Sequence, residues 1–269
     1  MHSISKTVDG YRYSILMRKF LEQNGFDFDG DFLSIPERYN RVKLDVGLSV
    51  SAPQSAIWLS RDPNLYVFGF EPVTQNIEAI KRGDTSWGIN LDPSQIDKRI
   101  KIIPCALSSH INSEGQKMFV TLNDSGCSSL LEPTSIEIAY EEVVPVYTLE
   151  AFLNYFPFHK IPIIEHLKID VQGMDLAVLK GAGKYLKKFL AITIEIDLVG
   201  YKQSENSLKE IKSILRSENF TSAPTTFLGR CKLKIRGLNI DFQVEDPTFF
   251  HKQNIKISQN HRVDIFQIG

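Results

Sequence analysis

The chain has 269 residues, 42% of them hydrophobic, and its 31 Lys and Arg residues nearly balance its 32 Asp and Glu residues, which leaves a formal net charge of −1. This composition supports a buried core and excludes extensive disorder, and near-neutrality argues against a general nucleic-acid binder, which needs a basic surface. The three scattered cysteines, Cys105, Cys127 and Cys231, exclude a disulfide scaffold and a zinc finger with paired cysteines, and they fit a reducing compartment.

The N-terminal residues carry helical periodicity but no targeting signal. Tyr11–Asn24 places its apolar residues on one side, and Gly25 follows where a left-handed residue commonly ends a helix. No secretory signal is present, and no stretch reaches the roughly 18 apolar residues that span a bilayer. We therefore expect a cytoplasmic protein with an N-terminal helical arm (residues 1–40) and one main domain (residues 41–269).

Apolar runs of strand length recur along the main domain. They are Arg41–Leu48, Leu65–Phe70, Ile100–Leu107, Ile163–Val171, Leu190–Ile196 and Val263–Ile268. Helical patterns follow four of them, at Ala52–Leu59, Thr74–Arg82, Asp175–Phe189 and Ser204–Asn219. Strands that alternate with helices indicate β-α-β units and a mostly parallel sheet.

Two segments interrupt this alternation and are typical of hairpin insertions. One begins at Gly115–Asn123, and we expect it to occupy residues 115–140; the other is Lys232–Val244. Loops over strand ends carry much of the specificity of such folds, so the first insertion is the expected place for acceptor recognition.

The end of the first strand carries Asp45 and Gly47. Ligands of open parallel sheets bind beyond the carboxyl ends of the strands, where a glycine lets the backbone approach a ligand and a carboxylate accepts hydrogen bonds. Ser51-Ala52-Pro53-Gln54 then resembles a capping box with proline in the first helical turn. A single glycine is a weak nucleotide fingerprint, so a plain β-turn-α connection is the alternative.

The second strand ends in Phe70-Glu71-Pro72. A carboxylate at the tip of the neighbouring strand is suited to the two hydroxyls of a ribose, since each oxygen can accept from one hydroxyl. Glu71 also follows Gly47 at about the spacing that nucleotide-binding folds use. The alternative is that Glu71 caps the next helix.

Further carboxylates end the later strands. Asp170 could hold a substrate amine or hydroxyl, coordinate a metal, act as a base or cap the following helix. Glu195 and Asp197 lie at i and i+2 of the next strand, so they share a face and could bind a divalent metal or a polyol. His110 follows the third strand and is a weaker candidate base, whereas His166 begins a strand and is expected to be structural.

Several motifs, in order and spacing, together resemble the FkbM family of S-adenosylmethionine-dependent methyltransferases. The resemblance covers about Leu44 to Glu195 and extends to the last expected strand. It rests on Asp45-x-Gly47, Phe70-Glu71-Pro72, Ser128-Ser129-Leu130, Val144-Pro145-Val146-Tyr147-Thr148-Leu149, Leu167-Lys168-Ile169-Asp170-Val171-Gln172-Gly173, Val178-Leu179-Lys180-Gly181-Ala182, Glu195 and Val263-Asp264-Ile265-Phe266.

The resemblance implies the class I methyltransferase fold, which is Rossmann-like: a seven-stranded, mostly parallel sheet with an antiparallel last strand and helices on both faces. It implies an O-methyltransferase that uses S-adenosylmethionine, often acting on a sugar or glycan hydroxyl. A divalent metal is possible but is not predicted. The N-terminal arm lies outside the resemblance; its aromatic residues could line the acceptor site or a homodimer contact, and packing against the core sheet is the alternative.

The resemblance also assigns residues by position. Asp45, Gly47 and Ser49 fall in the methionine-binding loop, Glu71 and Pro72 at the ribose, and Ala106, Leu107 and Ser108 near the adenine. Asp170 falls beside the sulfonium and the acceptor, and the candidate bases are Asp170, Glu195 and His110, in that order.

Three residues depart from the family pattern. Ser49 and Ser51 stand where the family usually has Asn and Gly, and Gln172 stands where it usually has Glu. These departures motivate an alternative function, a non-catalytic binding or scaffold domain that has lost the cofactor. A nicotinamide-dependent enzyme is a third hypothesis, but the first loop lacks the glycines it needs.

Overall fold

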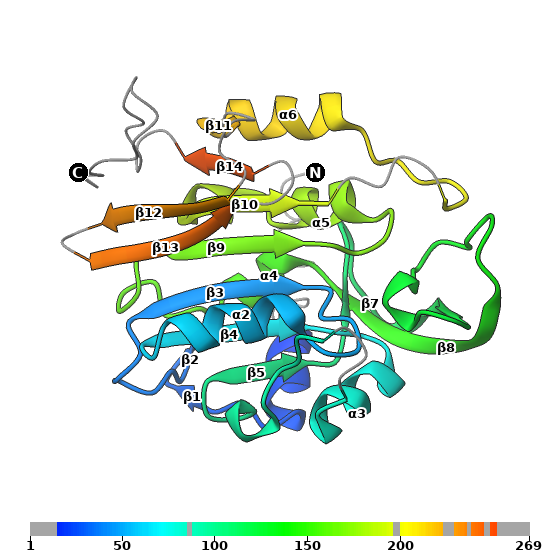
Figure 1. The fold of residues 1–269 in the computed structure, drawn as a ribbon, viewed down its shortest axis with the longest axis horizontal. Helices are drawn as coiled ribbons and strands as arrows, with labels where there is room; N and C mark the ends of the chain where they lie inside the picture. The colour runs from blue at the N-terminus through cyan, green and yellow to red at the C-terminus, as the bar shows by residue number, and fades with distance from the viewer. Residues whose placement is uncertain are drawn as a thin grey trace, which may run out of the picture.

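The computed structural model describes residues 15–84, 88–195, 200–222, 229–235, 238–244 and 248–251. Its centre is a seven-stranded sheet in the order β11-β14-β10-β9-β3-β4-β5 (Figure 1). Six strands run parallel, and only β14 (Thr248–His251) is antiparallel to its neighbours. The expected α/β architecture with a mostly parallel sheet is confirmed.

The inner strands follow the apolar runs of the sequence. Four of them lie side by side with residues that are nearly all buried: β3 (Arg41–Val46), β4 (Leu65–Phe70), β9 (Ile164–Ile169) and β10 (Phe189–Ile194). The sheet is completed by β5 (Ile100–Ile103) at one edge and β11 (Phe220–Ser222) at the other. Parallel strands buried on both faces need such continuous apolar sequences.

Helices cover both faces of this sheet. Successive residues of a strand point to opposite faces, and Phe68 and Phe70 share one core with α4 (Leu149–Leu153), α5 (Asp175–Gly181) and α6 (Leu208–Ser217). Leu65 and Val67 belong to a second core with α2 (Pro53–Arg61) and α3 (Thr74–Arg82). Residues 15–23 form a further helix, whose Met17 and Leu21 join the first core.

A separate small sheet comes from the segment between β5 and α4. It has the order β6-β8-β7 and consists of β6 (Ala106–Leu107), β7 (Asn112–Thr121) and β8 (Ile138–Tyr147). The long strands β7 and β8 are antiparallel, and Figure 1 shows them beside the main sheet. The connection between them holds a short 3₁₀ turn, Ser125–Cys127.

Two minor pairs of strands complete the description. The first is β1 (Phe28–Asp29) with β2 (Phe32–Leu33). The second is β12 (Gly229–Ile235) with β13 (Leu238–Val244), an antiparallel hairpin that confirms the one expected at Lys232–Val244. The strand expected at Val263–Ile268 lies outside the described residues.

Two predicted elements are interrupted in the structure. The strand expected at Ile100–Leu107 splits at Pro104 into β5 and β6, which belong to different sheets, because proline has no N–H to continue a ladder. The helix expected at Asp175–Phe189 ends at Gly181 and continues as a 3₁₀ helix, Gly183–Lys188. Gly183 has φ +51°, which breaks the α-helical path.

The predicted capping box before α2 is wrong. The residue at the N-cap is Ala52, with left-handed backbone at φ 47°, and no side chain caps the helix. The Ser51 hydroxyl is buried without a hydrogen-bond partner. Among the described residues, no helix is long and apolar enough to cross a membrane.

Candidate functional site

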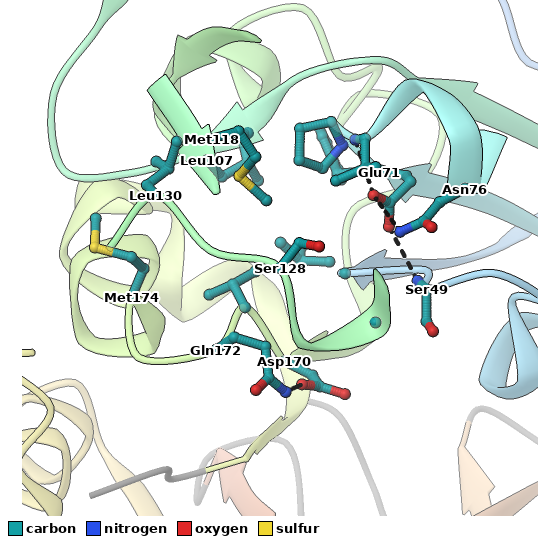
Figure 2. Close-up of a pocket in the computed structure, with 18 of the residues that line it drawn as sticks. Ser49, Glu71, Asn76, Leu107, Met118, Ser128, Leu130, Asp170, Gln172 and Met174 are labelled. Carbon is teal, nitrogen blue, oxygen red and sulfur yellow. Dashed lines mark hydrogen bonds between the residues drawn. The ribbon is translucent and has the colours of Figure 1, made fainter. Parts of the chain in front are cut away.

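A pocket lies at the carboxyl ends of β3, β4 and β9. It encloses about 560 Å³ of empty space, a volume that includes open solvent at its mouth. One side is formed by the strand ends and the other by residues 124–130, which we call the insertion loop. Figure 2 shows Ser128 of this loop between Glu71 and Met174.

The lining separates into polar and apolar parts. Apolar side chains dominate near β6 and β7, where Leu107, Met118, Leu130 and Met174 gather (Figure 2). Ser49, Glu71, Asp170 and Gln172 are polar residues that follow the strand ends. Three more polar residues come from α3 and the insertion loop: Asn76, Ser125 and Ser128. This combination suits a ligand with a flat apolar part and a polar or charged part.

Gly47 makes the closest backbone approach in the site. It has φ +86°, and a Cβ atom there would overlap the carbonyl oxygen of Asp170. Its N–H donates to the carbonyl oxygen of Phe70 at 3.0 Å. Ser49 and Ala52 also have left-handed backbone, at φ 57° and 47°, so this turn holds strain that the surrounding contacts must sustain.

Glu71 is buried at the pocket wall, with 3% of its surface exposed. One oxygen, Oε2, accepts from the Ser49 N–H at 3.0 Å. The other, Oε1, accepts from the Val73 N–H at 3.0 Å and from Asn76 Nδ2 at 3.2 Å. Burial raises the pKa of Glu71 to about 7, although these N–H donors favour the carboxylate.

The position of Glu71 is compatible with both roles considered for it, a ribose ligand and a cap of the next helix. Its side chain lines the pocket, as a ribose ligand would, and it also bonds the backbone at the start of α3. A carboxylate has about four acceptor positions, and protein donors fill three of them. Glu71 therefore also fixes the turn after β3 to the start of α3.

Lys168 joins the carboxylates at the ends of β3 and β9. Its Nζ lies 2.9 Å from Asp170 Oδ2, 3.7 Å from Asp45 Oδ1 and 3.1 Å from the Gly47 carbonyl oxygen. Burial favours the neutral amine, but the carboxylates of Asp170 and Asp45 raise the pKa of Lys168 above its ordinary value. Lys168 therefore stays charged and holds the strand ends together.

The two carboxylates differ in access. Asp45 is buried and does not line the pocket; its Oδ2 accepts from the Ser55 hydroxyl at 2.6 Å, and burial raises its pKa. The Asp170 side chain is 25% exposed and lines the pocket. Burial opposes its ionisation, but Lys168 and neighbouring hydrogen bonds hold the pKa of Asp170 below its ordinary value.

The insertion loop is fastened to the main sheet by side-chain hydrogen bonds. The Ser125 hydroxyl donates to Asn76 Oδ1, and Asn76 Nδ2 donates to the Ser125 carbonyl oxygen at 3.2 Å. The Ser129 hydroxyl donates to the Gln172 carbonyl oxygen at 2.7 Å. These bonds connect the loop to α3 and to the turn after β9.

The pocket gathers seven of the predicted site residues: Gly47, Ser49, Glu71, Pro72, Ala106, Leu107 and Asp170. Asp45, Ser108, His110 and Glu195 do not line it. Ser108 is buried against α5, where a Cβ at Gly181 would overlap its carbonyl oxygen, and its hydroxyl lies 3.3 Å from His110 Nδ1. Glu195 is exposed and forms a hydrogen bond with Asp170, and Asp197 lies outside the described residues.

Several pocket residues were not predicted, because they do not follow the ends of the main-sheet strands. Asn76 lies inside a helix, while Met118 and Ser125 come from the inserted segment. Lys168 does not line the pocket, but it bonds Asp170 and was also missed. It lies two residues before Asp170 on the same strand face, which was the signal available in the sequence. Within the described part of the chain, no group of three or more His, Cys, Asp or Glu residues could hold a metal ion.

Comparison with known proteins gives one result. A family model described as "Methyltransferase FkbM domain" matches residues 45–222. The matched range includes every residue that lines the pocket, from Val46 to Met174. No curated protein matches the chain.

Proposed function

Because the chain belongs to the FkbM methyltransferase family, we propose that it transfers a methyl group from S-adenosylmethionine to a hydroxyl oxygen of a sugar or glycan. The observation that carries this proposal is the pocket at the ends of β3, β4 and β9, which lies entirely within the family match. The sheet order, with β14 as its one antiparallel strand, supports a class I methyltransferase fold for the described residues from Arg41 onward.

The residues present fit this cofactor. The Gly47 turn leaves no room for a side chain, so backbone faces the pocket there. Asn76 and Ser125 supply hydrogen-bonding groups, and Leu107, Met118 and Leu130 offer an apolar wall for a purine. Asp170 places a negative charge where a positively charged ligand gains from it.

When bound, the cofactor supplies a methyl group on a positively charged sulfur, which is already activated for transfer to oxygen. The protein's part is then to position the acceptor and exclude water. Asp170 is the pocket carboxylate that stays ionised, so it can orient an acceptor hydroxyl by accepting its proton in a hydrogen bond. A polyol suits this rim, because Asp170 offers acceptor oxygens at the pocket wall.

A second function, a non-catalytic binding or scaffold domain, draws support from Glu71. Three protein donors already bond its carboxylate, which leaves little acceptor capacity for two ribose hydroxyls. Ser49 takes part in this arrangement through its N–H. A ligand that binds without displacing these bonds would have to use other polar groups of the pocket, because Asn76 and Ser125 already bond each other.

Calorimetric titration of the full chain with S-adenosylhomocysteine and with S-adenosylmethionine separates the two functions. We expect saturable binding of both, followed by transfer of an isotope-labelled methyl group to members of a panel of monosaccharides and glycans. Absence of binding at millimolar ligand would refute the methyltransferase proposal. Tight binding of S-adenosylhomocysteine would exclude the non-catalytic domain, since that domain is one that has lost the cofactor.

A further inference from the structure

Gln172 lies between the Asp170 carboxylate of the pocket and Tyr201, which contacts the insertion loop. Its Nε2 donates to Asp170 Oδ1 at 3.1 Å, and its Oε1 accepts from the Tyr201 hydroxyl at 2.7 Å. Figure 2 shows the Gln172 side chain directly beside Asp170. The amide thus donates on one side and accepts on the other.

Tyr201 extends these contacts to the insertion loop. Its hydroxyl also lies 2.8 Å from the Cys127 carbonyl oxygen, so its one proton is shared between two acceptors. The Tyr201 ring packs on the Gly173 turn, where an added Cβ would come within 3.2 Å of the ring. Backbone bonds continue this connection, since Thr134 N–H donates to Gly200 and Lys202 N–H donates to Glu132.

The position of residue 172 is fixed by its backbone as well. Gln172 has left-handed backbone at φ 54°, and its carbonyl oxygen accepts from the Ser129 hydroxyl. Backbone and side chain are therefore both held, which is the condition for a side chain to hold another in place.

Charged groups surround Asp170 on every side. Lys168 of the same strand bonds Oδ2, Glu195 at the end of β10 forms a hydrogen bond with the carboxyl group, and the carboxylates of Asp45 and Asp175 lie near enough to interact with it. Gln172 supplies a neutral donor among these groups. An ionised glutamate at position 172 could accept from Tyr201 but could not donate to Asp170.

We propose that Gln172 is a positioning residue that fixes the Asp170 carboxylate in the pocket, and that Tyr201 orients its amide and couples Asp170 to the insertion loop. The proposal rests on the proposed function, because it assigns Asp170 to the ligand side of the pocket. The amide at this position bonds both Tyr201 and Asp170, whereas an ionised glutamate could accept from Tyr201 but could not donate to Asp170.

The test compares Q172E with a matched control, Q203E. Gln203 is exposed, has the same left-handed backbone at φ 60° and lies two residues from Tyr201. Both variants add one carboxylate, but only the one at residue 172 meets Asp170. Two adjacent carboxylates titrate as a coupled pair, and one of them binds a proton well above its ordinary pKa.

The measurement is the affinity for S-adenosylhomocysteine between pH 5.5 and pH 8.5. We expect Q172E to bind like wild type at pH 5.5, where a protonated glutamate donates as the amide does, and about tenfold more weakly at pH 8.5. Q203E should stay within roughly threefold of wild type at each pH, and both should share any change caused by Glu71, whose pKa is about 7. The proposal would be overturned if the affinity of Q172E changed with pH in the same way as that of wild type. It would also be overturned if Q203E lost affinity at high pH as Q172E does.

A second readout separates this inference from the proposed function. The melting temperature of Q172E should fall relative to wild type as pH rises from 5.5 to 8.5, because a carboxyl pair with a raised pKa destabilises the fold once it ionises. This result requires no cofactor. If wild type binds no S-adenosylhomocysteine but this shift appears, the proposed function fails while the contact between Gln172 and Asp170 stands.

A milder variant keeps the proposal testable if Q172E does not fold. Y201F keeps the amide and removes the hydroxyl that orients it, so we expect about threefold weaker binding with no new pH dependence. If Y201F binds S-adenosylhomocysteine as tightly as wild type at every pH, Tyr201 does not orient Gln172. Together the two variants test the two ends of the same connection.

Discussion

At the scale of single residues, Gly47 shows how tightly the backbone is packed at the pocket. Gly47 and Gly25 are both left-handed, at φ +86° and +75°, but only at Gly47 would an added Cβ atom meet another part of the chain. An alanine at either position costs about 1–2 kcal/mol for the backbone conformation. Only G47A also forces the turn away from Asp170.

We therefore expect G47A to be destabilised by more than G25A and to bind S-adenosylhomocysteine at least about tenfold more weakly. G25A should keep wild-type affinity, since no atom lies within 4 Å of its added Cβ. Denaturant unfolding and calorimetry measure the two effects. Equal affinity in the two variants would show that the Gly47 turn does not contact the ligand.

Lys43 provides a residue-scale prediction about pH. It is 3% exposed, its Nζ lies 4.9 Å from the centre of the Trp58 ring, and burial lowers its pKa to about 8. Because the unfolded chain holds this proton more tightly than the folded chain, stability should rise as pH increases from 8 toward 10.5.

Replacing Lys43 with Met removes that dependence. Relative to K43M, wild type should gain up to roughly 3 kcal/mol of unfolding free energy between pH 7 and a pH above 10.5. K19M, which removes an exposed lysine, serves as the control and should follow wild type. Parallel profiles for wild type and K43M would contradict the prediction.

Gly47, Glu71 and Asp170 could be predicted from the sequence, because parallel strands bring their carboxyl ends to one edge of the sheet. Asn76, Ser125 and Tyr201 could not, since their contacts exist only once the insertion loop has folded onto the sheet. Asp45 shows a different limit. Its place in the first motif gave no sign that Ser55 and Lys168 would hold it behind the pocket wall.

At the scale of elements, the apolar runs predicted the inner strands to within a few residues. Buried parallel strands need apolar side chains on both faces, so the sequence signal is strong. Boundaries that depend on single residues were less predictable: Pro104 sends the chain into a second sheet, and Gly183 ends the α-helix early. The antiparallel strand β14 is short, and no pattern distinguished it.

The attachment of the insertion loop to α3 is an element-scale prediction. Asn76 makes three hydrogen bonds, two with Ser125 and one with Glu71. N76A leaves buried partners unsatisfied, which should cost about 1–3 kcal/mol. Hydrogen exchange of the amides in residues 125–128 should accelerate more than that of β9.

N123A is the control for this experiment, because Asn123 is exposed and immediately precedes the loop. It should leave the exchange rates close to wild type. If N76A produces no local acceleration in residues 125–128, Asn76 does not fasten the loop, and the attachment must come from Ser129 and Tyr201.

At the scale of the whole molecule, one large aromatic cluster supports the central sheet. Phe68 is 1% exposed, and its ring centre lies 5.2 Å from those of Tyr66 and Phe152 and 6.3 Å from that of Phe26. These rings come from β4, α4 and the segment after the first helix. Phe68 therefore joins the N-terminal part of the described chain to the sheet.

F68A should lower the free energy of unfolding by about 3–5 kcal/mol, through lost burial and the cavity left behind. V143A changes a residue that is 71% exposed, and its effect should stay within about 0.5 kcal/mol. Urea unfolding of both variants measures the difference. A small effect for F68A would mean that the arm and the sheet are stabilised independently.

The bond between Lys168 and the Gly47 carbonyl oxygen joins residues 121 positions apart, which has a consequence for folding kinetics. Contacts of such separation form late, because a long loop must close before they are made. The pocket therefore cannot form before β3 pairs with β9. In refolding, the recovery of S-adenosylhomocysteine binding should lag behind the helical circular dichroism signal, and simultaneous recovery would argue against this order.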